Sequence, residues 1–155
     1  MKFKTALMGL LFGFSSLYAK SYYVEAGEMF NVEPQLLWAI AKTESNFDIK
    51  ALNKNKNGTY DIGIMQINSI HLPELKEKYN IEQEDLYNPR VNIHIGAMIL
   101  KRSLNKHEGN LVNGVTCYNG RIKDNPYGKK VLEELSLALE TYNAKENSSV
   151  AQRSN

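Results

Sequence analysis

Glu44 is the residue whose position best suits proton-transfer chemistry. The run from Pro34 to Glu44 is helix-forming, and a proline fits the first helical turn because its missing N–H would be unpaired there. Leu37, Ala41 and Glu44 fall at i, i+4 and i+7, so the carboxyl group shares a stripe with apolar side chains. Partial burial, and the negative end of the dipole of a helix that should stop at Ser45-Asn46, both raise the pKa of a carboxyl group.

A carboxylic acid that is still protonated near neutral pH is the proton donor that cleavage of a glycosidic bond needs. The helix pattern is therefore consistent with Glu44 as a catalytic acid. The alternative, from the helix alone, is an ordinary glutamate that faces water at a helix end.

A second segment, Asp61–Asn68, contributes amide side chains. Gly63 tolerates a positive φ or a close backbone approach, and the apolar residues Ile64, Met65 and Ile67 can pack in the core. Gln66 and Asn68 alternate with these apolar residues, so both amides can point into one cleft. Amides donate and accept hydrogen bonds, which suits the hydroxyl and N-acetyl groups of amino sugars. The alternative is a buried strand whose amides bond the local backbone.

Four short motifs follow one another along the chain: Glu44-Ser45, Gly63-Ile64-Met65-Gln66-Ile67, Tyr118-Asn119 and Tyr127. In this order and at these spacings they resemble the soluble lytic transglycosylase (SLT-domain) family, whose members cleave bacterial peptidoglycan and have a lysozyme-like helical fold. The segment 61–71 is most similar to small, single-domain members linked to secretion and conjugation systems. The resemblance covers residues 22–135.

The resemblance implies a role for each matching residue. Glu44 would protonate the glycosidic oxygen between N-acetylmuramic acid and N-acetylglucosamine, then accept a proton from the muramoyl 6-hydroxyl, which attacks C1 and leaves a 1,6-anhydromuramoyl end. Ser45 would support Glu44 or the departing end. Tyr118 would bind the catalytic carboxyl group or stack on a sugar ring, unless it is a core tyrosine. The implied substrate-binding residues are Ser45, Met65, Gln66, Asn68, Tyr118, Asn119 and Tyr127.

The number of carboxylates separates the transglycosylase from other functions. A glycosidase that uses water normally pairs two carboxyl groups, whereas Glu44 has only two loosely placed companions, Asp48 and Asp61. One carboxyl group suffices if the nucleophile is part of the substrate. Two alternatives remain: a hydrolase of the goose-lysozyme type, and a non-catalytic glycan-binding assembly factor of a secretion apparatus.

One departure from the family pattern lies after Tyr118. The family typically has Ala-Tyr-Asn-x-Gly, but here Gly120 follows Asn119 directly, which predicts a different loop path. Cys117, the only cysteine, is interpreted as a buried, inert thiol. The three histidines fit no metal-binding spacing, so we predict no metal and no cofactor.

The N-terminal segment has the pattern of a secretory signal peptide. A short basic start is followed by an uncharged, mostly apolar stretch from Ala6 to Tyr18, and Leu17-Tyr18-Ala19 is a possible cleavage site. We therefore expect a signal peptide at residues 1–19 and a periplasmic protein. An uncleaved first helix is the alternative.

Removal of this segment changes the charge balance. The chain has 19 Lys and Arg against 17 Asp and Glu, and residues 1–19 contain two lysines and no acid, which leaves 17 against 17. A neutral mature chain gives no support for nucleic-acid binding. Expected partners are peptidoglycan glycan strands and components of a transenvelope secretion or conjugation machine, and the protein itself is expected to be a monomer.

The remaining pattern predicts one mainly α, lysozyme-like domain over residues 20–143, with a small irregular or β segment lining the cleft. Asn88 and Pro89 start a central helix in which Gly96 indicates close contact with another helix. A final helix runs from Tyr127 to about Tyr142, and residues 144–155 form a polar tail that is expected to be disordered.

Overall fold

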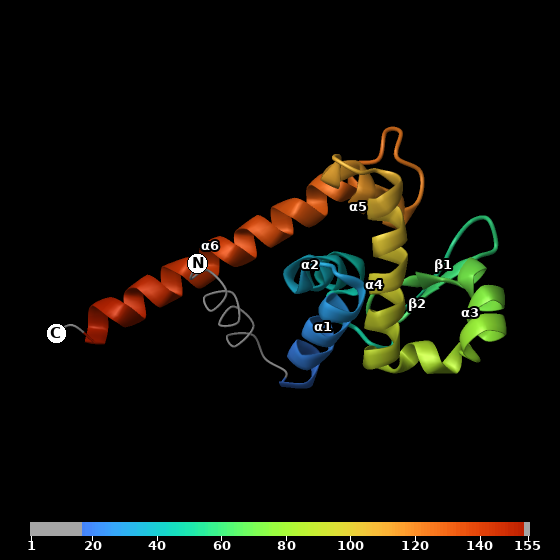
Figure 1. Cartoon of the computed structure of the whole chain (residues 1–155), viewed down its shortest axis with the longest axis horizontal. Helices are drawn as coiled ribbons and strands as arrows, with labels where there is room; N and C mark the ends of the chain where they lie inside the picture. The colour runs from blue at the N-terminus through green and yellow to red at the C-terminus, as the bar shows by residue number, and fades with distance from the viewer. Residues whose placement is uncertain (1–16, 154–155) are drawn as a thin grey trace.

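The computed structural model describes the backbone of residues 17–153 and the side chains of residues 22–144. Six α-helices, two short 3₁₀ helices and one small sheet lie within this range (Figure 1). The predicted signal peptide, residues 1–19, lies outside the described residues except for its last three, which begin α1. In chain order the elements are α1 (Leu17–Phe30), α2 (Pro34–Ser45), β1 (Leu52–Lys54), β2 (Tyr60–Ile62), β3 (Ile67–Asn68), η2 (Ser69–His71), α3 (Leu72–Tyr79), η3 (Glu84–Tyr87), α4 (Pro89–Lys106), α5 (Leu111–Asn119) and α6 (Tyr127–Arg153).

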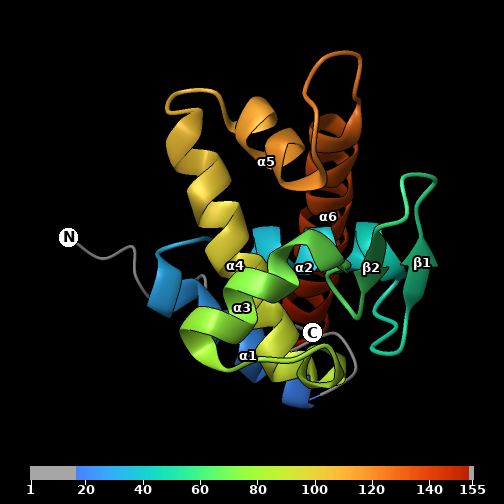
Figure 2. The same ribbon diagram turned by 90° about the vertical axis from the view of Figure 1, so that its right-hand side faces the viewer.

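The central helix is α4, which packs against both α1 and α5. It starts as predicted: the Asn88 side chain accepts a hydrogen bond from the Arg90 N–H, and Pro89 occupies the first turn. α1 and α2 lie on one side of α4, and the sheet and α3 lie on the other (Figure 1; Figure 2 shows the same arrangement from the side of the sheet).

Gly96 of α4 does allow a close contact, but not the predicted one with another helix. A Cβ atom at this position would lie 2.6 Å from the Met65 Sδ atom. The partner is therefore the turn between β2 and β3, which packs directly onto α4.

The predicted irregular or β segment is a three-stranded antiparallel sheet in the order β1-β2-β3. β1 pairs with β2 from Leu52 opposite Ile62 to Lys54 opposite Tyr60, and Asp61 is opposite Asn68 in β3. The strands are only two or three residues long, since turns rich in Asn and Gly interrupt them. The sheet therefore places polar side chains of β2 and β3 on one short ribbon.

The final helix is longer than predicted. α6 continues from Tyr127 to Arg153, so residues 144–153 are helical where a disordered tail was expected. This stretch contains no Gly or Pro and includes Ala, Lys, Glu, Gln and Arg, all of which favour helix. The C-terminal half of α6 extends past the other helices (Figure 1). No helix in the described part of the chain is long and apolar enough to cross a membrane.

Candidate active site

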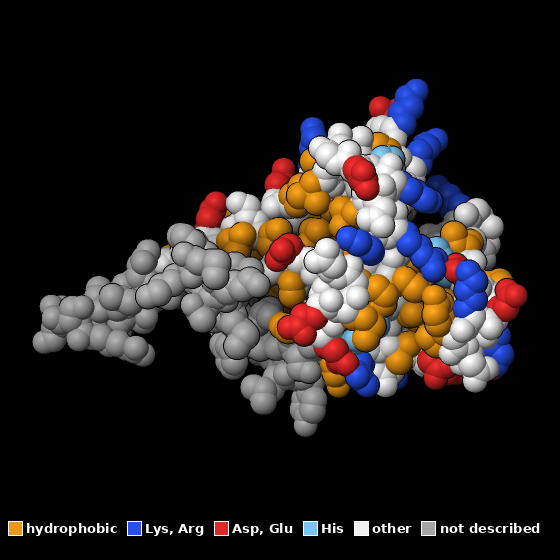
Figure 3. All heavy atoms as spheres, viewed as in Figure 1, with side chains coloured by type: hydrophobic (Ala, Val, Ile, Leu, Met, Phe, Trp, Pro, Cys, Tyr) orange, Lys and Arg blue, Asp and Glu red, His pale blue; other side chains and the backbone are white. Residues whose placement is uncertain are grey.

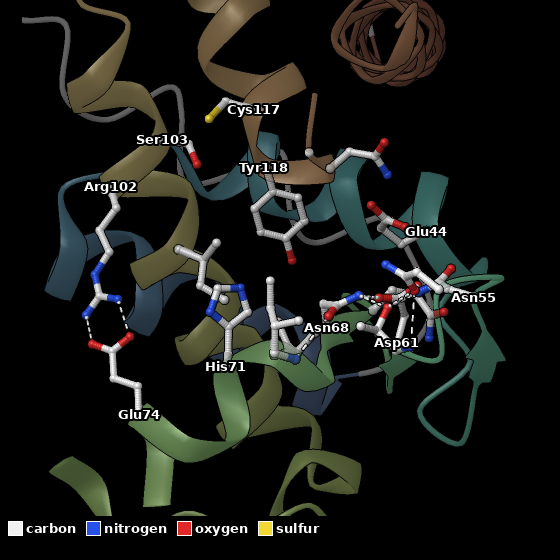
Figure 4. Close-up of a pocket in the computed structure, with 18 of the residues that line it drawn as sticks. Glu44, Asn55, Asp61, Asn68, His71, Glu74, Arg102, Ser103, Cys117 and Tyr118 are labelled. Carbon is white, nitrogen blue, oxygen red and sulfur yellow. Dashed lines mark hydrogen bonds and ion pairs between the residues drawn. The ribbon is translucent and has the colours of Figure 1, made fainter. Parts of the chain in front are cut away.

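Glu44 lies in the last turn of α2, as the sequence predicts. The helix ends at Ser45 because Asn46 adopts a left-handed conformation with φ 51°, and its N–H bonds back to carbonyls of the last turn. The side chains of Leu37 and Ala41, on the same stripe as Glu44, are fully buried. The carboxyl group of Glu44 therefore reaches the cleft from a helix that is fixed in the core (Figure 4).

The carboxyl group of Glu44 is bonded by side chains from the end of α5 and the start of α6. The Tyr127 hydroxyl donates a hydrogen bond to Glu44 Oε1 at 2.6 Å, and the Asn119 side chain also bonds this carboxyl group. Tyr127 is itself 8% exposed, and burial raises the pKa of its phenol well above the usual range. Tyr127 therefore remains a hydrogen-bond donor throughout the physiological pH range.

Burial raises the pKa of Glu44 to about 7, and the negative charge of Asp61 contributes in the same direction. The hydrogen bonds from Tyr127 and Asn119 oppose this rise because they favour the charged form. Near neutral pH the group therefore exists in both protonation states. The same side chain can donate a proton in one step and accept one in the next.

Tyr118 does not have the predicted contact with Glu44. Its hydroxyl donates to the Met65 carbonyl at 2.7 Å, and the contact with the carboxyl group, one of the two roles expected for Tyr118, belongs to Tyr127 instead. Tyr118 still lines the cleft, where its ring is available to a sugar (Figure 4). The two tyrosines thus have separate roles, one at the turn and one at the acid.

Asn92 is a site residue that the sequence reading missed. It is fully buried, its Nδ2 donates to the carbonyls of Ile62 and Leu86 at 2.8 Å each, and its Oδ1 accepts from the Met65 N–H at 2.9 Å. The side-chain nitrogen and oxygen of Asn92 are thus both paired with backbone groups of the turn and its surroundings. The sequence feature that could have revealed Asn92 is an amide on the apolar stripe of α4, four residues before Gly96.

Gly63 has both of the properties that were predicted for it. Its φ is +73°, and an added Cβ would lie 2.4 Å from Asn92 Nδ2 and 2.5 Å from the Leu86 carbonyl oxygen. Glycine is required here for the conformation and for the space. Asn92 can reach the turn only because this position carries no side chain.

Ser45 and Met65 act from behind the cleft rather than in it. Ser45 Oγ donates to the Ile64 carbonyl at 2.8 Å, which joins the end of α2 to the turn. The Met65 side chain is fully buried, so its contribution is its backbone, bonded by Tyr118 and Asn92. Neither residue is among those that line the cleft. The predicted support of Glu44 by Ser45 stays a prediction, since the Ser45 hydroxyl bonds the Ile64 carbonyl and not Glu44.

Gln66 and Asn68 both line the cleft, which has a volume of about 720 Å³. Asn68 Nδ2 donates to Asp61 Oδ1 at 2.7 Å, and Asn55 Nδ2 donates to Asp61 Oδ2 at 2.9 Å (Figure 4). Gln66 Nε2 donates to the Gly63 carbonyl at 2.9 Å. The amides thus face the cleft as predicted, but they also bond within the protein, as the alternative reading expected. A volume of this size suits an extended small ligand.

Cys117 is not the buried thiol that we predicted. It is partly exposed and lines the cleft together with His71 and Ser103. Burial lowers the pKa of His71, which favours the neutral form of its ring. Among the described residues, no group of His, Cys, Asp and Glu side chains is arranged to bind a metal ion.

Substitution of Tyr127 by Phe tests the hydrogen bond to Glu44. Loss of this bond removes an interaction that lowers the Glu44 pKa, so this pKa rises by about one unit. The measurement is the NMR titration of the Glu44 carboxyl group, with Tyr142→Phe on the same helix as control. An unchanged pKa in Tyr127→Phe would mean that this bond does not act on Glu44.

The chain is similar to a known protein family and to several known proteins. The model of the transglycosylase SLT domain matches residues 21–152. Invasion protein IagB of Salmonella typhimurium (strain SL1344) is 38% identical over 97 residues, which are 63% of this chain and 60% of IagB. Protein IpgF of Shigella flexneri is 36% identical over 118 residues, which are 76% of this chain and 74% of IpgF.

A solved structure has the same fold. The X-ray structure of an inactive mutant of lytic transglycosylase Slt from Pseudomonas aeruginosa matches with a TM-score of 0.64 at 22% sequence identity. The match covers 81% of this chain and 24% of the Slt chain, so it shows the fold of one part of that larger protein. The lysozyme-like, mainly α fold predicted from the sequence is thereby confirmed, and the family match over residues 21–152 shows that the chain belongs to the transglycosylase SLT domain family.

Proposed function

We propose that this protein is a lytic transglycosylase that cleaves the β-1,4 bond between N-acetylmuramic acid and N-acetylglucosamine in bacterial peptidoglycan. The observation that carries the proposal is the environment of Glu44: a carboxyl group with a pKa of about 7, bonded by Tyr127, in a cleft lined by amides. Membership in the SLT domain family supports the same substrate.

The proposed reaction needs two proton transfers, and in this proposal Glu44 makes both. In the first, protonated Glu44 gives its proton to the glycosidic oxygen as the bond from that oxygen to muramoyl C1 breaks. In the second, the carboxylate accepts the proton of the muramoyl 6-hydroxyl as its oxygen bonds to C1. The products are a free N-acetylglucosamine 4-hydroxyl and a 1,6-anhydromuramoyl end, and no water is consumed. An internal nucleophile is already at high effective concentration.

Hydrolysis is the second candidate, and Asp61 is the observation that favours it. Asp61 lines the cleft, acts electrostatically on Glu44, and accepts hydrogen bonds on both oxygens from Asn55 and Asn68. A carboxylate in a hydrogen-bonded, partly solvated position beside a protonated carboxyl group is the pairing found in retaining glycosidases. Mass spectrometry of the muropeptides separates the two functions, because hydrolysis products are heavier by one water.

Substitution of Asp61 by Asn tests its role directly. Removal of the negative charge lowers the pKa of Glu44, so the high-pH limb of kcat/KM moves downward while cleavage below that limb continues. This pKa shift is opposite in sign to that of Tyr127→Phe. Loss of cleavage at every pH, in a variant that melts like the wild type, would instead assign Asp61 to the bond-breaking step.

The cellular role that we propose is local opening or remodelling of the cell wall, with export to the periplasm by the signal peptide. The similarity to Invasion protein IagB and to Protein IpgF supports a link to a transenvelope secretion machine. N-terminal sequencing of the exported protein tests the export step. A mature chain that begins at residue 20 is the expected result, and an intact Met1 in the membrane fraction would contradict it.

A further inference from the structure

One end of the cleft carries positive charge that the proton transfers at Glu44 do not use. Arg102 and Lys106 lie four residues apart in α4, and both line the cleft. Arg102 is paired with Glu74 at the opposite end of the pocket from Glu44 (Figure 4). In the face shown in Figure 3, Lys and Arg side chains gather over the C-terminal part of α4.

The charges at this end do not balance. Glu74 accepts hydrogen bonds from both terminal nitrogens of Arg102 at 3.1 Å each and from Lys78 at 3.0 Å. Arg102 and Lys78 together hold the pKa of Glu74 at about 2, so this carboxylate remains charged. One carboxylate thus faces two cations, and Lys106 adds a third with no hydrogen bond or ion pair to the described side chains.

The substrate that we have proposed carries negative charge in only one part. The N-acetylated sugar rings are neutral, and the lactyl carboxyl group of a muramoyl residue is used in the amide bond to its peptide stem. Free carboxylates lie along the stem itself. Cations in the cleft wall thus have no partner on the sugar rings, whereas they match the stem.

We propose that Lys106, together with the exposed edge of Arg102, forms a subsite for a carboxylate of the peptide stem. The inference rests on the proposed function, since it places a second part of the same substrate in the same cleft. Arg102 is 43% exposed as a side chain, so its guanidinium group is accessible while Glu74 fixes its orientation. Glu74 also competes with the stem for this cation, which gives the subsite a second, opposite test.

The experiment compares two substrates that differ only in charge. One is purified peptidoglycan strands with native stems, and the other is the same strands after the stem carboxylates have been converted to primary amides. Initial rates give kcat and KM for wild type, Lys106→Gln, Glu74→Gln and the control Lys129→Gln, an exposed lysine that does not line the cleft. Thermal melts establish that each variant is folded.

With native strands, Lys106→Gln is expected to raise KM about 3- to 5-fold at unchanged kcat, as for a partly exposed ion pair. Glu74→Gln is expected to lower KM by about 2-fold, because Arg102 then loses its competing charge. Both effects on KM vanish with amidated strands, and Lys129→Gln leaves KM unchanged for both substrates. An equal KM change with both substrates, or no change with native strands, would overturn the subsite.

Failure of the proposed function is recognised separately. If the wild type cleaves neither substrate, cosedimentation of Glu44→Gln with insoluble native and amidated strands still tests the subsite. The subsite is supported if Glu44→Gln binds amidated strands more weakly than native strands. It also predicts that a second substitution, Lys106→Gln, weakens binding to native strands only. Binding that is indifferent to both changes refutes it.

Discussion

Replacement of Glu44 by Gln is expected to reduce cleavage of peptidoglycan by about 10²- to 10⁴-fold, the range that general acid–base catalysis supplies. Glutamine keeps the size of the side chain and can still accept the hydrogen bond from Tyr127, but it has no proton to transfer. Release of soluble muropeptides from purified cell wall measures the effect. Glu133→Gln, which changes an exposed glutamate on α6, is the matched control and should retain full activity.

The same substitution is expected to stabilise the protein at high pH. The folded pKa of Glu44 is about 7 against an ordinary value of 4.5, so its contribution to stability is fully present below pH 4.5 and is lost as pH rises through 7. Above pH 8 the wild type therefore loses up to about 3 kcal/mol relative to Glu44→Gln. Denaturant unfolding at pH 4 and pH 8.5 measures the difference.

Equal stability of the two proteins at both pH values would show that Glu44 is not held in a buried environment. A variant with wild-type turnover would remove Glu44 from the mechanism altogether. The two readouts are independent, because one depends on the ionisation of the group in the free protein and the other on the reaction.

Gly63→Ala is the second substitution with a large expected effect, this time on the turn that carries the cleft amides. The new Cβ would stand 2.4 Å from Asn92 Nδ2 and 2.5 Å from the Leu86 carbonyl, in a backbone conformation with φ +73°. Backbone strain costs about 1 kcal/mol, and loss of buried hydrogen bonds of Asn92 costs about 1–3 kcal/mol for each group left unpaired. We therefore expect a loss of about 3–5 kcal/mol in the free energy of unfolding, with a fall in activity.

Gly58→Ala is the control for this prediction. Gly58 also has a positive φ, +86°, but no atom lies within 4 Å of an added Cβ. Its cost should be the backbone strain alone, about 1 kcal/mol. Urea unfolding of both variants separates the two contributions, and equal destabilisation would mean that the contact with Asn92 does not matter.

The sequence predicts the fold well where local signals and tertiary packing agree. The cap at Asn88, the proline starts of α2 and α4, and the stripe of Leu37 and Ala41 all appear as expected. The predicted end of α6 was wrong because a polar segment without Gly or Pro can form a helix even if it lacks apolar periodicity. Polarity predicts exposure more directly than it predicts disorder.

The site was less predictable, because it depends on contacts between distant residues. The sequence predicts Glu44 and both tyrosines as site residues, but whether Tyr118 or Tyr127 reaches the Glu44 carboxyl group depends on where α5 ends and α6 begins. Asn92 illustrates the same limit: its spacing shows that it faces the core, but only the turn at Gly63 shows which backbone groups it pairs with.

Digestion of peptidoglycan in water enriched in ¹⁸O tests the central claim most directly, with Glu44→Gln beside the wild type. Transglycosylation takes no atom from water, so we predict muropeptides with 1,6-anhydromuramoyl ends, no ¹⁸O, and no such products from the variant. Muropeptides that carry one ¹⁸O at a reducing end would contradict the account and establish hydrolysis, with Asp61 as the second carboxylate.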